Sequence, residues 1–325
     1  MKTYYTGLVG DVGGTNARLA LVDSEGHIRH PKTYAAKDYG SLSDVIATYL
    51  ETTTGRKRPP RAVIAVAGPV VDGEIEFTNL DWRISEGELI GTFEFELAKL
   101  INDFAAQAMA APALSGDNLR AIGPNLKGAT GAPLVVCGAG TGFGVAGLVR
   151  NDRGDQAVAS EGGHAAFAPN DALEAEVLAW LREKHGRVSI ERVLSGPGLN
   201  DLYRALCAIR GQTPDLADEK AVLASAQAGG EGVAIEAIDM FCGILGSVAG
   251  DLALTFGARG GAYLSGGIAP RMIDRLASGS FRKRFEDKGR LSDYMADIPT
   301  CLIVHPYAAL VGAARALAQM EGAPL

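Results

Sequence analysis

The chain has 325 residues, of which 47% are hydrophobic and 21% are charged. Such a composition can bury a sizeable core, which excludes a wholly disordered protein, and the length favours two domains around a cleft. The 31 basic and 38 acidic residues give a formal net charge of −7. Broad binding to nucleic acid needs concentrated Lys and Arg, so we expect no nucleic-acid partner.

Cysteine spacing and apolar stretches bear on the compartment. No two of the four cysteines lie within 30 residues of each other, which is unlike a zinc ribbon or a disulfide framework. Asp11 and Arg18 interrupt the N-terminal apolar pattern, so we expect no signal peptide. Residues 233–257 are apolar but contain acidic side chains, which indicates a buried helix rather than a membrane span. We therefore expect a cytoplasmic protein with no membrane partner.

Short apolar runs bounded by turn residues predict strands in the first part of the chain. Between them, apolar residues at helical spacing behind Ser41, a capping residue, predict a helix over residues 42–50. The stretch at residues 112–132 is rich in proline and glycine and is a candidate linker. The strands predicted in this part cover residues 4–9, 17–22, 62–67 and 97–101.

The second part of the chain repeats the arrangement of strand, glycine turn and strand. A mostly helical region follows over residues 170–257, and Asn170 or Asp171 can cap its first helix. An alanine-rich helix is expected after Pro306. Two similar α/β halves around a cleft account for both the repeat and the length. The strands predicted in this part cover residues 133–137, 145–149, 262–264 and 301–304.

The two glycine turns are candidate anion sites. Gly13-Gly14-Thr15 and Gly140-Thr141-Gly142 can each expose successive backbone N–H groups, because glycine permits close approach and positive φ values. A single such turn commonly just closes a hairpin, but two in corresponding halves could hold different phosphates of one nucleotide. The chain has no Gly-Lys dipeptide and hence no P-loop. A predicted strand follows the second turn, unlike the dinucleotide fingerprint.

Asp11 directly precedes the first glycine turn. A carboxylate beside phosphates is electrostatically costly unless a cation or water intervenes. It could contact Mg²⁺ indirectly, since Mg²⁺ usually retains several waters. Alternatively, Asp11 is an Asx-type turn residue, and the residues alone leave both interpretations open.

Asn102 and Asp103 follow a predicted strand directly. A carboxylate at the end of a strand, projecting into a cleft, suits a general base, and the neighbouring amide can orient a hydroxyl group. The alternative is that this pair caps a helix over residues 104–111. The local sequence by itself favours the cap.

Three further polar residues suit a sugar. Glu161 and His164 flank a permissive Gly-Gly turn, and their spacing is not that of an HExxH zinc site. Glu191 can be a hydroxyl acceptor, or simply a carboxylate that favours a helix start. Together with Asn102 and Asp103 they form a chemically sensible polyol site, because each buried hydroxyl needs hydrogen-bond partners.

Several long motifs resemble those of the bacterial glucokinase family, in its zinc-free branch. The resemblance implies an α/β, two-domain actin-like (ribonuclease H-like) ATPase fold with an interdomain cleft. We expect a small domain of residues 1–112 plus 303–325 and a large domain of residues 113–302. The motifs occur in order over nearly the whole chain, at residues 10–18, 102–104, 138–142, 161–164, 191–198, 265–268 and 285–290.

The resemblance also implies an activity, which is ATP-dependent phosphorylation of glucose at O6 to give glucose 6-phosphate and ADP. Asp103 is then the general base, and a homodimer is expected. Mg²⁺ is expected on ATP, with an indirect contact to Asp11, and no other metal is expected. The residues implied to bind glucose are Asn102, Asp103, Glu161, His164 and Glu191. Those implied to bind ATP are Gly10, Asp11, Val12, Gly13, Gly14, Thr15, Gly140, Thr141, Gly266 and Gly267.

Other functions remain open to different degrees. A kinase for another hexose, such as mannose or an N-acetylated amino sugar, would carry the same phosphoryl-transfer motifs. A sugar-responsive repressor would need a helix-turn-helix ahead of the first glycine turn, where only nine residues precede Gly10. A dehydrogenase is disfavoured by the strand expected after the second turn.

Overall fold

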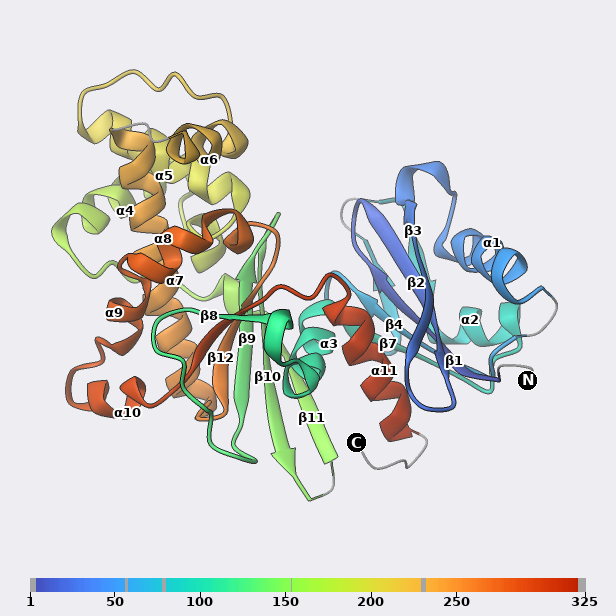
Figure 1. The fold of residues 1–325 in the computed structure, drawn as a ribbon. Helices are drawn as coiled ribbons and strands as arrows, with labels where there is room; N and C mark the ends of the chain where they lie inside the picture. Colours follow the sequence, from blue (N-terminus) through green and yellow to red (C-terminus); the bar gives the residue numbers. More distant parts are fainter. Residues whose placement is uncertain (1–3, 56–57, 78–79, 153, 229–231, 321–325) are drawn as a thin grey trace. The chain divides into compact units, whose positions relative to one another are not determined.

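The computed structural model describes residues 4–55, 58–77, 80–152, 154–228 and 232–320, and the chain packs into two compact units (Figure 1). The first unit comprises Met1–Ser115, Leu148–Ala159 and His305–Leu325, and the second comprises Gly116–Gly147 and Ser160–Val304. The boundaries drawn from the sequence put residues 148–159 in the large domain, whereas their packing groups them with the first unit. The sequence-based boundaries remain a prediction.

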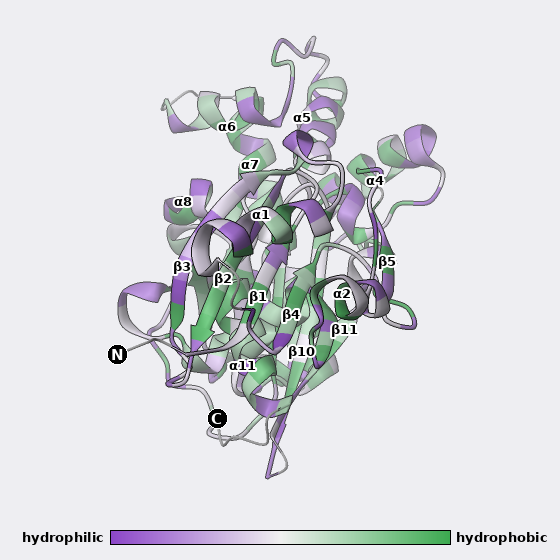
Figure 2. Cartoon of the chain, turned by 90° about the vertical axis from the view of Figure 1, so that its right-hand side faces the viewer, coloured by the Kyte–Doolittle hydropathy of each residue, from purple (hydrophilic) through white to green (hydrophobic). Residues whose placement is uncertain are grey.

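The sheet of the first unit contains β1 (Tyr5–Val12), β2 (Asn16–Asp23), β3 (Ile28–Ala35), β4 (Arg61–Val66) and β7 (Leu97–Asn102). The strand order is β3-β2-β1-β4-β7, with β2 antiparallel to β1, and with β4 parallel to both β1 and β7. Strand β3 is largely hydrophilic and lies at an edge, whereas the central strands are hydrophobic (Figure 2). This gradient is the expected one, because a central strand of a covered sheet is buried on both faces.

Helices cover both faces of this sheet, and they are α1 (Leu42–Thr54), α2 (Glu86–Phe93), α3 (Asp103–Ala110) and α11 (Ala308–Met320). Ile64 of β4 belongs to the core that buries α1 and α2. The next residue, Ala65, packs with Ala106 of α3 and Ala309 of α11. Successive strand residues point to opposite faces, so the two helix pairs lie on opposite sides. A small hairpin joins β5 (Glu74–Glu76) and β6 (Arg83–Ser85).

A second sheet contains β8 (Leu119–Ala121), β9 (Leu134–Ala139), β10 (Phe143–Asn151), β11 (Gly154–Ser160), β12 (Gly261–Ser265) and β13 (Thr300–Ile303). Its order is β11-β10-β9-β12-β13-β8. Strand β12 is parallel to both β9 and β13, and β8 is antiparallel to β13. All six residues of β9 are buried, as expected for a central strand.

The second unit contains a long apolar helix, α7 (Val233–Phe256). The other helices of this unit are α4 (Ala172–His185), α5 (Gly196–Ile209), α6 (Glu219–Gln227), α8 (Ile273–Ser278), α9 (Phe281–Glu286) and α10 (Ser292–Ala296). Helices α5, α6, α8 and α9 pack against α7. Helix α7 is long and apolar enough to cross a membrane, but 78% of its apolar window is buried inside the protein. A Cβ at Gly246 would lie within 3.0 Å of the Phe281 carbonyl, so glycine allows α9 to pack closely against it. The prediction of a buried core helix is confirmed.

Most of the predicted elements are present. Ser41 caps α1 and Asp171 caps α4, each through its side chain. The linker expected at residues 112–132 is wrong in part, because residues 119–121 form β8 and pair with β13. Among the described residues, five strands were not predicted, and they are β3, β5, β6, β8 and β11.

Candidate active site

Parallel strands bring the first glycine turn and Asp103 to one edge of the first sheet. Val12 at the end of β1 pairs with Val66 of β4, which in turn pairs with Asn102 at the end of β7. Neighbouring strands lie about 4.8 Å apart, so the Cα atoms of Val12 and Asn102 are roughly 10 Å apart. The segment at residues 10–15 and the carboxylate of Asp103 therefore occupy the same edge.

Asn102 and Asp103 form the junction between β7 and α3. The Asn102 Oδ1 atom accepts a hydrogen bond from the Ala105 N–H at 3.1 Å, and its Nδ2 donates to the Gly68 carbonyl at 3.2 Å. The helix-cap interpretation therefore holds for Asn102. Asp103 is the first residue of α3, and its Oδ1 accepts the Phe104 N–H at 2.9 Å. A negatively charged side chain is favourable at a helix N-terminus.

Asp11 has a partner that neither interpretation of the sequence included. Its Oδ2 lies 2.8 Å from Nη1 of Arg18, directly opposite on β2. The Asp11 side chain is 19% exposed and that of Arg18 is 39% exposed, so this is a half-buried ion pair across two strands. Asp11 therefore forms an ion pair across two strands and does not act as an Asx-turn residue. Its indirect contact to Mg²⁺ remains a prediction.

The expected reason for glycine in the two turns is wrong in part. Gly13, Gly140 and Gly142 do not adopt positive φ values. Close approach does apply at Gly142, where a Cβ would lie within 3.0 Å of Glu191. A positive φ, +86°, occurs instead at Gly266, where a Cβ would also lie within 3.0 Å of the Ala139 carbonyl.

The second glycine turn, Gly266-Gly267 and the start of α5 lie together in the second unit. Strands β9 and β12 end in register, with Gly138 opposite Ser265. The Gly140 N–H donates to the Gly142 carbonyl at 2.8 Å, which closes the turn. The Gly140 carbonyl accepts the Gly196 N–H of α5 at 2.9 Å. The nucleotide residues predicted for this unit thus meet at one edge of its sheet.

The sugar-binding residues predicted in this unit also come together. They lie on two 3₁₀ turns, η4 (Gly162–His164) with Glu161 before it and η5 (Ile190–Arg192). The Ile190 N–H donates to the Ala165 carbonyl at 2.9 Å, which joins the two segments. Glu161 and His164 lie 3.9 Å apart, and both side chains are 61% exposed. Exposed acceptors and a ring nitrogen on adjoining turns can serve a ligand with several hydroxyl groups.

Glu191 is held more firmly than its neighbours. Its Oε2 accepts the Phe143 N–H at 2.9 Å, next to the second glycine turn. Its carbonyl accepts a hydrogen bond from Ser195 Oγ at 2.7 Å, and Ser195 also caps α5 by accepting the Gly198 N–H. Sequence reasoning missed Ser195, although a serine just before Gly-Pro is a typical helix-start signal.

The candidate residues therefore form two groups, one in each unit. The first unit holds Asn102, Asp103 and the segment at residues 10–15. The second unit holds the other predicted residues, which are Gly140, Thr141, Glu161, His164, Glu191, Gly266 and Gly267.

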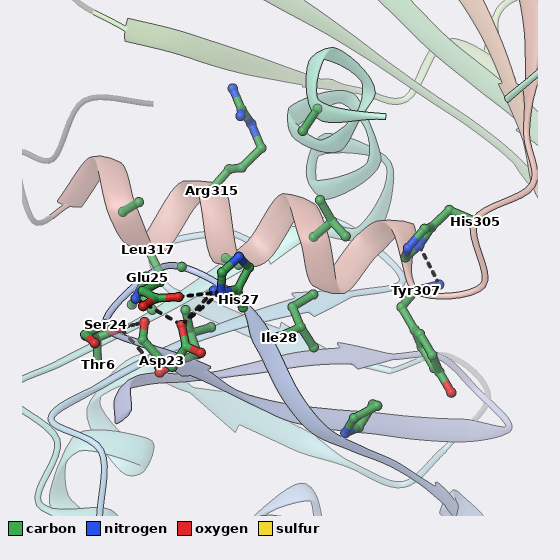
Figure 3. A pocket seen from close by; sticks show the side chains of 17 residues that line it. Thr6, Asp23, Ser24, Glu25, His27, Ile28, His305, Tyr307, Arg315 and Leu317 are labelled. Atoms are coloured by element: carbon green, nitrogen blue, oxygen red, sulfur yellow. Dashed lines mark hydrogen bonds and ion pairs between the residues drawn. The ribbon is translucent and has the colours of Figure 1, made fainter. Parts of the chain in front are cut away.

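A cavity of about 760 Å³ in the first unit contains none of these residues (Figure 3). It lies between α11 and the turn from β2 to β3, where ligand atoms of Asp23, Glu25 and His27 lie within 4.8 Å of one another. The Asp23 carboxylate already accepts Arg29 Nε at 2.7 Å and the N–H groups of Glu25 and His27 at 3.0 and 2.9 Å. This cluster therefore closes the turn.

Comparisons with known proteins bear on both the fold and the family. The family model described as glucokinase matches residues 8–320. A glucokinase of Caulobacter sp. (strain K31) is 50% identical over 314 residues, which covers 96% of this chain and 94% of that protein. The crystal structure of a glucokinase from an Antarctic psychrotroph is 41% identical with a TM-score of 0.87, covering 96% of this chain and 98% of that one. A ROK family glucokinase from Streptomyces griseus has a similar fold, with a TM-score of 0.63 at 20% identity over 94% and 97% of the chains.

The fold and these likenesses define a sugar kinase of the two-domain α/β, actin-like ATPase class, which confirms the predicted fold class. Within this class, the chain belongs to the glucokinase family, because the family model matches nearly its whole length. The resemblance drawn from the motifs is confirmed. The roles of individual residues remain predictions.

Proposed function

We propose that this protein transfers the γ-phosphoryl group of ATP to O6 of glucose, giving glucose 6-phosphate and ADP. Its family and its 50% identity to a glucokinase support this activity. A solved relative of the same fold, the Streptomyces griseus protein, was in complex with glucose and AMPPNP. The structural observation that carries the proposal is the in-register ending of β1, β4 and β7, which sets a carboxylate beside a glycine turn.

In the proposed reaction Asp103 accepts the proton of the glucose O6 hydroxyl as that oxygen attacks the γ-phosphorus. The new O6–P bond forms as the bond between the γ-phosphorus and the bridging oxygen breaks, and ADP leaves. Asn102 positions Asp103 by capping the helix on which Asp103 is the first residue. A general base contributes about 10²–10⁴-fold to the rate.

Charge on the transferred group needs stabilisation by fixed donors. The Gly13 and Gly140 N–H groups already donate to the Asn16 and Gly142 carbonyls within the turns, so other backbone N–H groups of the two turns would serve this purpose. Mg²⁺ bound with ATP would supply further positive charge. The proposed nucleotide contacts are those predicted from the resemblance, namely residues 10–15, Gly140, Thr141 and, near adenosine, Gly266 and Gly267. Because Asp11 is paired with Arg18, its contact to Mg²⁺ would run through water.

Glucose binding is assigned to Asn102, Asp103, Glu161, His164 and Glu191. Carboxylates accept two or more hydroxyl hydrogen bonds, and an imidazole can donate or accept one. A site built to hydrogen-bond hydroxyl groups discriminates strongly against analogues that lack them. Preference for glucose over mannose therefore depends on the partners of the 2-hydroxyl.

We also propose that the enzyme is a cytoplasmic homodimer. The absence of clustered cysteines and the burial of α7 support an intracellular, membrane-free protein. Light scattering after size-exclusion chromatography tests the dimer, because a mass near the 33.8 kDa of one chain contradicts it.

The direct test is an ADP-release assay with glucose, mannose, fructose, galactose and N-acetylglucosamine. We expect the highest kcat/KM with glucose and complete dependence on ATP. A higher kcat/KM with mannose or N-acetylglucosamine would reassign the substrate within hexose kinases. Reduction of NAD by a sugar without ADP release would instead indicate a dehydrogenase.

A further inference from the structure

The peptide group between Gly142 and Phe143 lies under the carboxylate of Glu191. The Phe143 N–H donates to Glu191 Oε2 at 2.9 Å. Within the part of the chain that the structure describes, no hydrogen-bond donor contacts the other carboxylate oxygen, Oε1. One oxygen is therefore tied to the protein backbone, and the other is left for a ligand hydroxyl.

Gly142 permits this arrangement only because it has no side chain. A Cβ at this position would lie within 3.0 Å of Glu191 Oε2, closer than real Cβ atoms approach a neighbour. The φ of Gly142 is not positive, so the backbone alone would accept alanine. What requires glycine at 142 is the carboxylate of Glu191, which lies 49 positions further along the chain.

Phe143 also supports the second sugar-binding segment. A Cβ at Gly163, between Glu161 and His164, would lie within 3.0 Å of the Phe143 carbonyl oxygen. The N–H of Phe143 thus holds η5, and its C=O lies against η4. Both segments are positioned by the residue that directly follows the second glycine turn.

We propose that Gly142 is a positioning residue for glucose binding, which fixes the Glu191 carboxylate on the Phe143 N–H so that Oε1 faces the sugar. This inference rests on the proposed role of Glu191 in binding glucose. The same turn carries Gly140 and Thr141, the proposed phosphate contacts, so sugar recognition and phosphate recognition are built on one short segment.

A double-mutant cycle tests the inference. In Gly142→Ala, the added Cβ must displace the Glu191 carboxylate, which is the end of a flexible side chain. We expect the carboxylate to lose the Phe143 N–H, and losing a charge-assisted hydrogen bond raises the glucose KM by roughly 10- to 100-fold. The ATP KM should change much less. In the Glu191→Ala background, Gly142→Ala should raise the glucose KM no further, because the residue that it displaces is already absent.

Two controls separate this effect from a general loss of structure. Gly91→Ala in α2, where the added Cβ would meet no atom within 4 Å beyond its chain neighbours and the backbone of its own helix, should leave both KM values unchanged. Calorimetric titration of glucose into each variant without ATP should show the same cycle in the dissociation constant. A purely structural defect would instead weaken glucose and ATP binding together.

The inference is overturned if Gly142→Ala raises the glucose KM by the same factor with and without Glu191. It is also overturned if the ATP KM rises as much as the glucose KM. If the wild-type protein neither binds glucose nor releases ADP, the proposed function fails instead. A crystal structure of Gly142→Ala then decides the positioning claim, and Glu191 still bonded to the Phe143 N–H would refute it.

Discussion

Asp103 lies at the junction between β7 and α3, and this junction determines its surroundings. Its partner Asn102 caps α3, so the backbone of Asp103 has little freedom to move. The Asp103 carboxylate also accepts the N–H of its own neighbour, Phe104. If Asp103 is the base, as proposed, these two hydrogen bonds hold its carboxylate in place for a substrate hydroxyl.

Replacing Asp103 by asparagine keeps the shape of the side chain and removes its ability to take a proton. We expect kcat to fall by about 10²–10⁴-fold with a small change in the glucose KM. Steady-state kinetics at saturating ATP measures both values. Asp38→Asn, an exposed aspartate of the same unit, is the matched control. Near-normal turnover in Asp103→Asn would remove Asp103 from the role of base.

The hydrogen bonds of the Asp23 carboxylate predict that its contribution to the free energy of unfolding depends on pH. Burial acts to raise the pKa of its carboxyl, but the Arg29 hydrogen bond and the N–H groups of His27 and Glu25 outweigh it, so the pKa of Asp23 lies below 3.8. A lowered pKa stabilises the folded state above the unfolded-state pKa of about 3.9, and this stabilisation is lost as the pH falls through the folded-state value.

Asp23→Asn should therefore lower the free energy of unfolding by about 1.5–3 kcal/mol at pH 7, the range for hydrogen bonds to a charged group. The difference from wild type should shrink as the pH falls below about 4. Urea unfolding between pH 7 and pH 3 measures it. A difference that stays constant over this range would mean that the charge of Asp23 contributes nothing.

Helices α4, α7 and α9 are joined by a buried polar network. Glu174 of α4 has a side chain only 1% exposed, and it forms an ion pair with Arg284 of α9. Arg284 also donates to Ser247 of α7 at 2.9 Å, and the Asn170 N–H donates to Glu174 at 2.8 Å. Removing one member leaves an uncompensated buried charge, which is costly in a low-dielectric interior.

Glu174→Ala should reduce the free energy of unfolding by about 3–5 kcal/mol. Chemical denaturation at pH 7 is the measurement. Glu176→Ala, an exposed glutamate two positions further along the same helix, should change it by less than about 0.5 kcal/mol. Equal effects of the two substitutions would show that the buried ion pair contributes no more to stability than an exposed glutamate does.

Helix α11 packs closely on α3 because of one glycine. A Cβ at Gly312 would overlap the carbonyl oxygen of Ala106. Gly312→Ala should therefore force the helices apart and destabilise the first unit by about 1–3 kcal/mol. In Gly91→Ala the added Cβ would meet no atom within 4 Å beyond its chain neighbours and the backbone of α2, so this substitution should instead stabilise by about 0.5–1 kcal/mol through helix propensity. Thermal unfolding compares the two, and a Tm for Gly312→Ala at or above that of wild type would contradict the packing argument.

Most of α7, the most apolar helix of the protein, is buried. Because 78% of the apolar window of α7 is buried, little hydrophobic surface remains on this helix for lipid. We expect the expressed protein to stay in the supernatant after ultracentrifugation of a lysate without detergent. Recovery in the membrane pellet, with release only by detergent, would show that α7 is exposed to lipid.

The first unit is built from three separate segments of the chain, one from each end and one from the middle. Helix α11 near the C-terminus completes the layer of α3, some 200 residues earlier in the chain. This long-range return covers one face of the strands β1, β4 and β7, which run parallel and are buried on both faces.

Local patterns in the sequence determined most helices and central strands, because apolar periodicity and capping residues act within a few positions. Ser41 and Asp171 are examples, and so are the buried strands β4 and β9. The polar strands β3 and β11 and the short β8 escaped prediction. They are stabilised by hydrogen bonds to neighbouring strands rather than by a hydrophobic pattern of their own.

The sequence also determined which kinds of residues the site needs, since carboxylates, amides and glycine turns are visible as motifs. Only the tertiary structure decided their partners. Asp11 meets Arg18 through strand pairing, and Glu191 meets Phe143 across 48 positions of chain. Contacts of this kind depend on how strands and turns are brought together in space, and no local pattern encodes that arrangement.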